Sequence, residues 1–591
     1  MKKTGIPRKI VRRLLEVPGY LVKQGCRSKA LRFLRNTSSA RAIQEEVLLG
    51  ILRKNEKSEF GQKYGFAKIK SAQEFKSQVP IFTYEDLRSD IERVKAGQTT
   101  CLFGPDEKVL MFALTSGTTS KPKFIPVTPA SLKKYLQGWK VWGGFLLFDH
   151  PDAFSGYALQ VVSRQKKPPL RGIIPCGSIS GFIADTQNPL FKLTYVGRSS
   201  GLIEEPLGRY YYFLRSAIEE DITFITTPNP STLVLLGRLV DEEKEKIIKD
   251  VHDGTLSRKM PIPQTVCKRI ERRLKPNKIR SRELERVVEK SGRLLPRDFW
   301  PHLKVLATWK GGSVSIYLPG LKEFFGDVPA RDIGLVASEG RFTIPTTDQG
   351  AAGLLNFPAS FFEFIPEDEI ESEKPTTFLC DELAVGKNYF PLLTSSGGLY
   401  RYNILDLVRV VGYCYQAPFL EFLSKGKHFS SITGEKISEF QVVEAAKAAA
   451  KVCGFHLDNF RLAPFWATTP YYGVMLEERG IPEEKLKSFA EKFEENLGRS
   501  NIEYLEKRRS QRLDPIRVKI IPAGTFAQEK ASLIAGRGAI AEQYKHPFLS
   551  KEIHRDSTLN ILREIGPGPN PTDNEAHFVR QGSGSQGDSG C

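Results

Sequence analysis

The sequence has neither a long apolar run nor paired cysteines. No stretch approaches the roughly 20 apolar residues that a helix needs to cross a bilayer, so no transmembrane segment is expected. The eight cysteines are scattered and include no C-x-x-C pair, which excludes the usual zinc-ribbon and dithiol motifs. Scattered thiols are typical of free cysteines in a reducing compartment. The sequence therefore predicts a cytoplasmic protein.

Acidic residues are in the minority, and the signatures of nucleic-acid-binding folds are missing. The 87 Lys and Arg residues exceed the 68 Asp and Glu residues, which gives a formal net charge of +19 at pH 7. This surplus suits an anionic partner such as ATP, a nucleic acid or an acidic membrane. The basic residues are, however, spread among acidic ones, without an RNP, zinc-finger or helix-turn-helix motif. A solvated basic surface with a nucleotide site is favoured over nucleic-acid binding.

The chain is too long for a single hydrophobic core, and its composition changes along its length. A basic N-terminal segment without a signal-peptide core is expected to form a helix that docks on the protein itself. A weak membrane contact of this helix and an organelle-targeting role stay open. The C-terminal segment is rich in Gly, Ser and Pro, which is typical of disorder. The predicted parts are a helical extension (1–39), a large domain (40–423), a smaller α+β domain (424–565) and a disordered tail (566–591).

Short, β-rich apolar runs alternate with helical stretches in the large domain. Such alternation predicts an α/β fold with buried strands. Strands are expected at residues 109–114, 158–162, 222–226, 303–308, 333–336 and 399–411. Helices are expected at residues 41–54, at 241–293 as a charge-rich exposed group, and at 439–451 behind a Ser438 cap.

The most informative segment is residues 109–128, VLMFALTSGTTSKPKFIPVT. A buried strand leads into a turn of small hydroxyl residues that two lysines close. Small side chains let backbone N–H groups approach an anion, hydroxyls donate further bonds, and lysine adds positive charge. The spacing is not that of a P-loop. The segment predicts a phosphate-binding loop built from Thr115, Ser116, Gly117, Thr118, Thr119 and Lys123.

Four further segments carry residues suited to a nucleotide. Gly311 and Gly312 follow a predicted strand and would let the backbone approach an adenine ring. Ser338 and Glu339 follow another strand, and a carboxylate beside phosphates can hold Mg²⁺. Each segment alone also fits an ordinary turn or a solvated surface. The remaining candidates are Arg401 for a phosphate, Asp406 for a ribose, and Lys545 for an α-phosphate.

Taken together and in this order, these segments resemble the Gretchen Hagen family of acyl acid–amido synthetases, a branch of the adenylate-forming superfamily. The similarity runs from about residue 40 to residue 547. It includes the motifs FGQKYGF (60–66), PIFTYE (80–85), GSISG (177–181), TTPNP (226–230), VASEGRFTIP (336–345), SFFEFIP (360–366) and TGEKISE (433–439). The resemblance implies a large N-terminal α/β domain, a mobile C-terminal α+β lid and a site between them.

The resemblance also implies a two-step reaction. A carboxylic acid and ATP, with Mg²⁺, give an acyl-adenylate and pyrophosphate; an amine, usually of an amino acid, then displaces AMP and forms an amide. By the same resemblance Glu339 holds Mg²⁺, Asp406 holds the ribose, and Lys123 and the lid lysine Lys545 act in catalysis. Such a protein aligns its substrates, neutralises charge and excludes water. The many aromatic and aliphatic residues are compatible with an apolar acyl group.

Two residues depart from the family pattern. Ser120 and Leu405 replace glycines, in the phosphate loop and just before the ribose aspartate. If either backbone has a positive φ, the side chain costs about 1 kcal/mol or more, and the nucleotide site is weakened. A non-catalytic protein that binds an acyl group or a nucleotide therefore stays an alternative. An acyl-CoA ligase with a thiol acceptor is another, and RNA binding ranks last.

Overall fold

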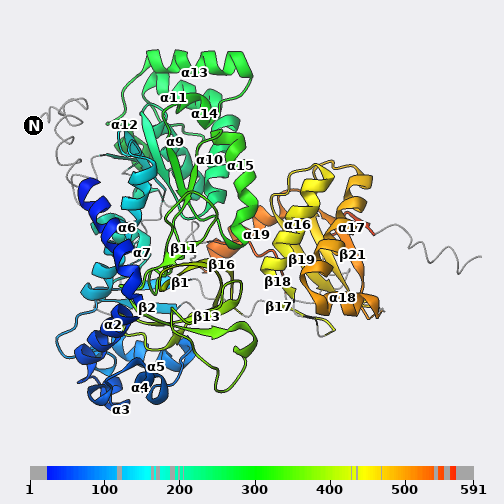
Figure 1. Cartoon of the computed structure of the whole chain (residues 1–591). Helices are drawn as coiled ribbons and strands as arrows, with labels where there is room; N and C mark the ends of the chain where they lie inside the picture. Colours follow the sequence, from blue (N-terminus) through cyan, green and yellow to red (C-terminus); the bar gives the residue numbers. More distant parts are fainter. Residues whose placement is uncertain are drawn as a thin grey trace, which may run out of the picture. The chain divides into compact units, whose positions relative to one another are not determined.

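The structure is a computed structural model, and its chain divides into two compact units (Figure 1). The first unit contains residues 1–426 and 539–544, and the second contains residues 427–538 and 545–591. No helix in the described part of the chain is long and apolar enough to span a membrane. The predicted extension up to residue 22 and the predicted tail from residue 567 lie outside the described residues. The structure describes residues 23–115, 123–161, 166–167, 174–186, 194–197, 200–203, 205–426, 429–433, 435, 437–467, 469–510, 512–537, 544–550 and 560–566.

The first unit contains a five-stranded parallel sheet with the order β6-β3-β7-β8-β9. Its strands are β6 (Tyr195–Val196), β3 (Tyr157–Gln160), β7 (Ile222–Thr226), β8 (Val305–Thr308) and β9 (Ala330–Asp332). All of β8 is buried, as expected for a strand covered on both faces. The helices that share its core are α9 (Pro206–Ala217), α10 (Pro230–Glu242), α11 (Lys244–Asp253), α12 (Gln264–Glu271), α13 (Lys278–Ser291) and α15 (Leu318–Phe325). The strands predicted at 158–162, 222–226 and 303–308 are confirmed to within two residues.

The strand expected at residues 333–336 is wrong. β9 ends at Asp332, and the chain turns at Gly334, whose φ is +88°. A Cβ at Gly334 would lie 2.4 Å from the carbonyl oxygen of Thr343, so only glycine fits this turn. The Asp332 carboxylate accepts a hydrogen bond from the Gly334 N–H. The turn, and not a continued strand, leads the chain to Ser338 and Glu339.

Two more sheets of the first unit carry the other site segments. β1 (Met111–Thr115) pairs antiparallel with β2 (Lys123–Val127) and parallel with β5 (Cys176–Gly177), which pairs with β4 (Lys166–Lys167). The seven-stranded sheet has the order β10-β11-β16-β15-β13-β12, with β14 paired to β13. Its strands are β10 (Thr343–Ile344), β11 (Gly353–Leu355), β12 (Phe361–Pro366), β13 (Asn388–Thr394), β14 (Tyr402–Asn403), β15 (Asp406–Cys414) and β16 (Ala417–Lys425). Helices α2 (Ala40–Asn55) and α6 (Pro129–Asp149) share the core of these sheets.

The strand expected across residues 399–411 is interrupted. β14 ends at Asn403 and β15 begins at Asp406. Arg401 and Leu405 have φ values of +41° and +61°, which lie in the left-handed region and not in the β region. The sequence pattern showed the apolar residues of this segment but not its two bends. These bends set the direction in which Asp406 leaves the loop.

The second unit is a smaller α+β fold. Its main sheet has the order β19-β20-β21-β22, and α16 packs against α17 beside it. Ser438 caps α16 by accepting a hydrogen bond from the Gln441 N–H, which confirms the predicted cap. Its elements are α16 (Glu439–Cys453), β19 (Phe460–Phe465), β20 (Tyr471–Glu477), α17 (Glu483–Ser500), α18 (Ile502–Arg509), β21 (Asp514–Ile521), α19 (Thr525–Arg537) and β22 (Arg563–Ile565). The predicted fold class, a large N-terminal α/β domain with a smaller C-terminal α+β domain, is confirmed.

Candidate functional site

The predicted phosphate loop connects two paired strands. Thr115 ends β1, Lys123 begins β2, and these two residues are partners in the antiparallel register. The intervening Ser116, Gly117, Thr118, Thr119 and Ser120 lie outside the described residues. Their grip on a phosphate therefore stays a prediction. The register places the two ends of the loop opposite each other, and Lys123 lies at the second end.

Charged side chains from distant segments converge beside Lys123. Burial lowers the pKa of Lys123. The neighbouring charge of Lys425 also lowers this pKa, whereas the carboxylates of Glu339 and Asp406 raise it. The Asp406 Oδ1 atom lies 3.9 Å from the Lys425 Nζ atom. Asp406, and more weakly Glu339, raise the pKa of Lys425. The two carboxylates and two ammonium groups therefore lie near enough to act on one another's charge, and Asp406 and Lys425 form an ion pair.

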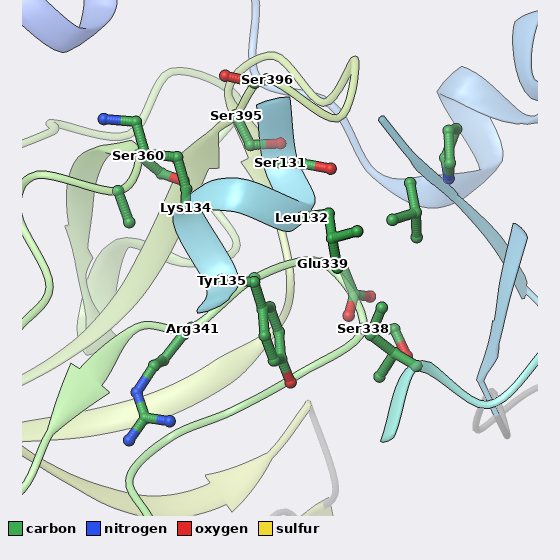
Figure 2. Close-up of a pocket in the computed structure, with 15 residues that line it drawn as sticks. Ser131, Leu132, Lys134, Tyr135, Ser338, Glu339, Arg341, Ser360, Ser395 and Ser396 are labelled. Carbon is green, nitrogen blue, oxygen red and sulfur yellow. The ribbon is translucent and has the colours of Figure 1, made fainter. Parts of the chain in front are cut away.

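Glu339 is presented at the tip of a tight turn. Ala337 and Gly340 exchange backbone hydrogen bonds of 2.9 and 3.3 Å, and Val336 bridges to Arg341. The Glu339 side chain is buried. It lines a pocket together with Ser338, Tyr135 and Arg341 (Figure 2). The two predicted residues Ser338 and Glu339 are thus placed on one wall of a cavity in the first unit.

Leu405 stands directly before Asp406 in a left-handed conformation, with φ +61°. The Leu405 N–H donates to the Asn403 Oδ1 atom at 2.8 Å, and its carbonyl oxygen accepts from the Gly426 N–H. These bonds hold a backbone shape that glycine adopts more easily than leucine. The sequence predicts strain at Leu405 if its φ is positive, and in the structure this φ is positive. Asp406 itself is buried at the start of β15.

The prediction that Arg401 pairs with a phosphate does not fit the structure. Its Nε and Nη2 atoms bind both carboxylate oxygens of Glu363, at 2.9 and 2.7 Å. Its Nη1 atom donates to the carbonyl oxygens of Lys76 and Val79, and Nη2 also reaches Thr377. All five N–H donors of a guanidinium are thereby satisfied. Arg401 is a core residue, and sequence reasoning could not see a partner 38 positions away.

Gly311 and Gly312 lie between β8 and a short 3₁₀ helix, η5 (Gly312–Tyr317). Gly312 has φ +63°, and a Cβ there would lie 2.9 Å from the ring of Phe422. A Cβ at Gly311 would lie 3.0 Å from Ala351 Cβ. The glycines therefore allow close packing against β16. Adenine binding by this turn stays a prediction.

Lys545 begins a segment of the second unit that is fixed at its next residue. The His546 Nε2 atom donates to the Phe460 carbonyl oxygen at 2.8 Å, and the ring packs between Phe526 and Phe548. Burial lowers the pKa of His546 to about 3, so the imidazole is neutral. Lys545 itself is exposed. Its catalytic role stays a prediction.

Three site residues were missed by sequence reasoning. Lys425 ends β16, two residues beyond the predicted end of the large domain at residue 423. Tyr402 is fully buried, its hydroxyl group has no hydrogen-bond partner among the described residues, and Glu339 and Asp406 add to the effect of burial in raising its pKa. Arg341 was part of a motif but was given no role. Its only signal in the sequence was its place two residues after Glu339.

Models of one family match three successive parts of the chain. They are the GH3 family N-terminal domain at residues 30–330, the central domain at 353–425 and the C-terminal domain at 440–554. The first of these alone covers half of the chain. This is the Gretchen Hagen family that the sequence motifs resemble.

Known proteins agree with this assignment. A jasmonoyl–L-amino acid synthetase (JAR4) of Nicotiana attenuata is 24% identical over 538 residues, which cover 86% of this chain and 91% of the relative. An indole-3-acetic acid-amido synthetase (GH3.3) of Arabidopsis thaliana is 22% identical, with 88% and 91% covered. The structure of the AtGH3.15 acyl acid amido synthetase in complex with 2,4-DB has the same fold, with a TM-score of 0.78 at 20% identity over 91% of this chain and 97% of that one. The chain therefore belongs to the GH3 family of acyl acid amido synthetases.

Proposed function

We propose that this protein uses ATP to activate a carboxylic acid and then joins the acyl group to the amine of an amino acid. In the first step a carboxylate oxygen bonds to the α-phosphorus of ATP, and the bond to pyrophosphate breaks. In the second step the amine nitrogen bonds to the acyl carbon, AMP leaves with the electron pair of the C–O bond, and the amine loses a proton. The observation that carries this proposal is the convergence of Lys123, Glu339 and Asp406 in a chain of this family.

The charges of the site suit these steps. We assign Lys123, with the loop of residues 116–119, to the phosphates, because an ammonium group stabilises the charge that develops on a transferring phosphoryl group. We assign Asp406 to the ribose hydroxyls, since a carboxylate accepts hydrogen bonds from both. Lys425 lies 3.9 Å from Asp406 and sets a positive charge beside this carboxylate. Lys545 is assigned to the α-phosphate by the family resemblance alone.

The residues also fit a magnesium ion that accompanies the nucleotide. Glu339 is buried against the pocket, and none of the other residues that the structure describes binds its carboxylate by a hydrogen bond or an ion pair. Mg²⁺ in nucleotide sites takes one or two carboxylates and completes its shell with phosphates and water. The lack of a three-ligand cluster within the described residues is therefore compatible with it. When bound, the ion would supply positive charge to the phosphates.

The acceptor is the part of this proposal that most needs a test. The full-length protein is incubated with ATP, Mg²⁺, a panel of carboxylic acids and either an amino-acid mixture or CoA, and the products are identified by mass spectrometry. We expect an acyl–amino acid and AMP. A thioester without an amide would make the protein an acyl-CoA ligase. No acid-dependent pyrophosphate would leave a binding protein with a decayed site.

A further inference from the structure

The pocket beside Glu339 is lined largely by polar side chains. Hydroxyl groups come from α6 and from three loops, and Lys134 adds an ammonium group. Apolar side chains of Pro126, Val127, Leu132, Ile179 and Ala359 share the lining, so the pocket suits an acid that has an apolar body and a polar end. The polar lining residues are Ser131, Lys134, Tyr135, Ser338, Glu339, Arg341, Ser360, Ser395 and Ser396.

Arg341 is the unusual member of this wall. Its side chain is almost fully buried, with 2% exposed. The Nη2 atom donates to the Ile333 carbonyl oxygen at 2.7 Å, and the guanidinium lies 4.4 Å from the centre of the Trp139 ring. Within the part of the chain that the structure describes, the Arg341 Nε and Nη1 atoms have no hydrogen-bond partner. A buried cation with unsatisfied donors destabilises a protein unless something else binds it.

No acidic residue of the described chain forms an ion pair with Arg341. Asp332 is the acidic group that acts on it most clearly, but only at long range. The two carboxylate oxygens of Asp332 instead accept from the backbone N–H groups of Lys310 and Gly334, at 2.6 and 2.5 Å. The charge of Arg341 is therefore not matched by a contacting carboxylate of the protein.

The fold makes room for this arginine. Gly138 lies in the middle of α6, where glycine costs about 1 kcal/mol relative to alanine. A Cβ at Gly138 would lie only 2.6 Å from the Arg341 Cδ atom. Gly143 lies in the same helix, but a Cβ there would meet no atom within 4 Å. The glycine at position 138 thus permits Arg341 to pass beneath the helix.

Arg341 and Glu339 mark two ends of the pocket. In Figure 2 the side chain of Tyr135 lies between those of Arg341 and Glu339, and both charged groups act on the pKa of Tyr135, which burial raises. An acid that is activated beside Glu339 and reaches Arg341 has to pass the Tyr135 ring with its far end. A carboxylate at that far end would satisfy the buried guanidinium by charge-assisted hydrogen bonds.

We propose that the pocket selects a carboxylic acid with a second carboxylate, which Arg341 binds while the first is activated beside Glu339. This inference rests on the proposed function, since it names the substrate class of the same site. The second carboxylate stays unreacted and serves only recognition.

The test compares acids of matched length in the pyrophosphate-release assay. Glutarate is paired with valerate, adipate with hexanoate, and isophthalate with benzoate. We expect kcat/KM for the better dicarboxylates to exceed that of their partners by at least about tenfold, the effect of one charge-assisted contact. A preference of the unmodified protein for the monocarboxylates would overturn the inference without any variant.

Variants then assign the preference to Arg341. In Arg341→Met we expect KM for the dicarboxylate to rise about 10- to 100-fold relative to KM for the matched monocarboxylate. Gly138→Ala displaces Arg341 and is expected to shift KM in the same direction, whereas Gly143→Ala is the matched control and leaves it unchanged. An unchanged ratio between dicarboxylate and monocarboxylate in Arg341→Met would contradict the inference.

A binding measurement separates this inference from the proposed function. Each dicarboxylate alone, without ATP, is added to the protein, and the thermal midpoint is recorded. A rise in the thermal midpoint that Arg341→Met abolishes supports dicarboxylate binding in the pocket. If such a rise is seen but no acid releases pyrophosphate, only the ligase proposal fails. Acid-dependent pyrophosphate without any dicarboxylate preference refutes the pocket inference and leaves the ligase intact. Neither response refutes both.

Discussion

Two of the arginines that are buried in the first unit, Arg401 and Arg341, have different surroundings. Arg401 lies beneath β14 with every donor satisfied by Glu363, Thr377 and backbone carbonyls. Arg341 lines the pocket with two nitrogens unsatisfied. Both are almost inaccessible to solvent, with 5% and 2% exposed. Burial alone therefore does not distinguish a core cation from one that awaits a ligand; the partners do.

The two residues teach opposite lessons about sequence motifs. Arg401 stands five residues before the ribose aspartate and was expected to bind a phosphate, yet it connects β12 to the C-terminal end of helix α4 (Ala72–Gln78). Arg341 stands two residues after the Mg²⁺ candidate and was given no role, yet it lines the pocket with two buried nitrogens that have no partner among the described residues. A charged residue near a motif acquires its role from the segments that the fold brings to it.

The largest loss of stability is expected when the ion pair between Arg401 and Glu363 is removed. Arg401→Met leaves Glu363 as a buried carboxylate without its partner, which costs about 3–5 kcal/mol. We expect the unfolding free energy of the first unit, measured by urea denaturation, to fall by this amount. The control is the double variant Arg401→Met/Glu363→Leu, which removes both charges and should recover most of the loss. A loss below 1 kcal/mol in the single variant would mean that the pair is not buried as described.

The same substitution at the other arginine sharpens the contrast. Arg341→Met removes unsatisfied donors whose burial costs about 1–3 kcal/mol, while it loses one hydrogen bond and the contact with Trp139. We expect the unfolding free energy of the protein without substrate to stay equal or to rise. A loss as large as that of Arg401→Met would show that Arg341 is also a core cation.

His546 is a buried ionisable group of the second unit. Because its imidazole is neutral, its burial leaves no unpaired charge. The pKa of His546 is lowered to about 3, against about 6.5 in an unfolded chain. Below pH 6.5 the unfolded state therefore binds a proton that the folded state does not, so stability falls by about 1.4 kcal/mol per pH unit down to pH 3. The test is the thermal midpoint of the second unit's transition between pH 7.5 and 5 in the full-length protein. His546→Gln keeps a donor for Phe460 and should flatten this slope; an equally steep slope would assign it to other groups.

The smallest effect concerns backbone strain beside Asp406. Leu405→Gly relieves a left-handed leucine and is expected to stabilise the protein by about 1 kcal/mol. Tyr415→Gly is the matched control, because Tyr415 has φ +51° and lies exposed in the turn between β15 and β16, where it makes no contribution to the site. ATP affinity is measured for both by titration calorimetry. If Leu405 crowds the ribose, only Leu405→Gly binds ATP more tightly than the unmodified protein. Equal ATP affinity in the two variants would show that Leu405 does not weaken the nucleotide site.

Local patterns predicted much of the fold. The alternation of apolar strands and helices, the Ser438 cap and the strand before the phosphate loop are properties of short segments, and the structure has them. The failures lie where distant contacts decide. The strand expected at 333–336 is replaced by a turn in which the carbonyl oxygen of Thr343 leaves no room for a side chain at position 334. Residues 399–411 bend at Leu405, whose backbone is bonded to Asn403 and Gly426.

The candidate site was predicted as a set of residues but not as an arrangement. Motifs indicated Lys123, Glu339 and Asp406, which the fold brings together. They gave no hint of Lys425, whose approach to Asp406 depends on the pairing of β15 with β16. They also missed the space beneath Gly138, more than 200 positions from Arg341, because sequence spacing carries no information about such a contact. The substrate class that we propose therefore rests on contacts that sequence spacing does not contain.

The most direct test of the account is acid-dependent pyrophosphate release by the full-length protein and two carboxylate variants. Glu339→Gln removes the proposed metal ligand, and Asp368→Asn changes an exposed carboxylate outside the pocket. We predict release by the unmodified protein and by Asp368→Asn, and a loss of about 100-fold or more in Glu339→Gln, the size typical of removing one electrostatic contact to a transition state. Equal release by Glu339→Gln, or release that does not depend on the acid, would contradict the account.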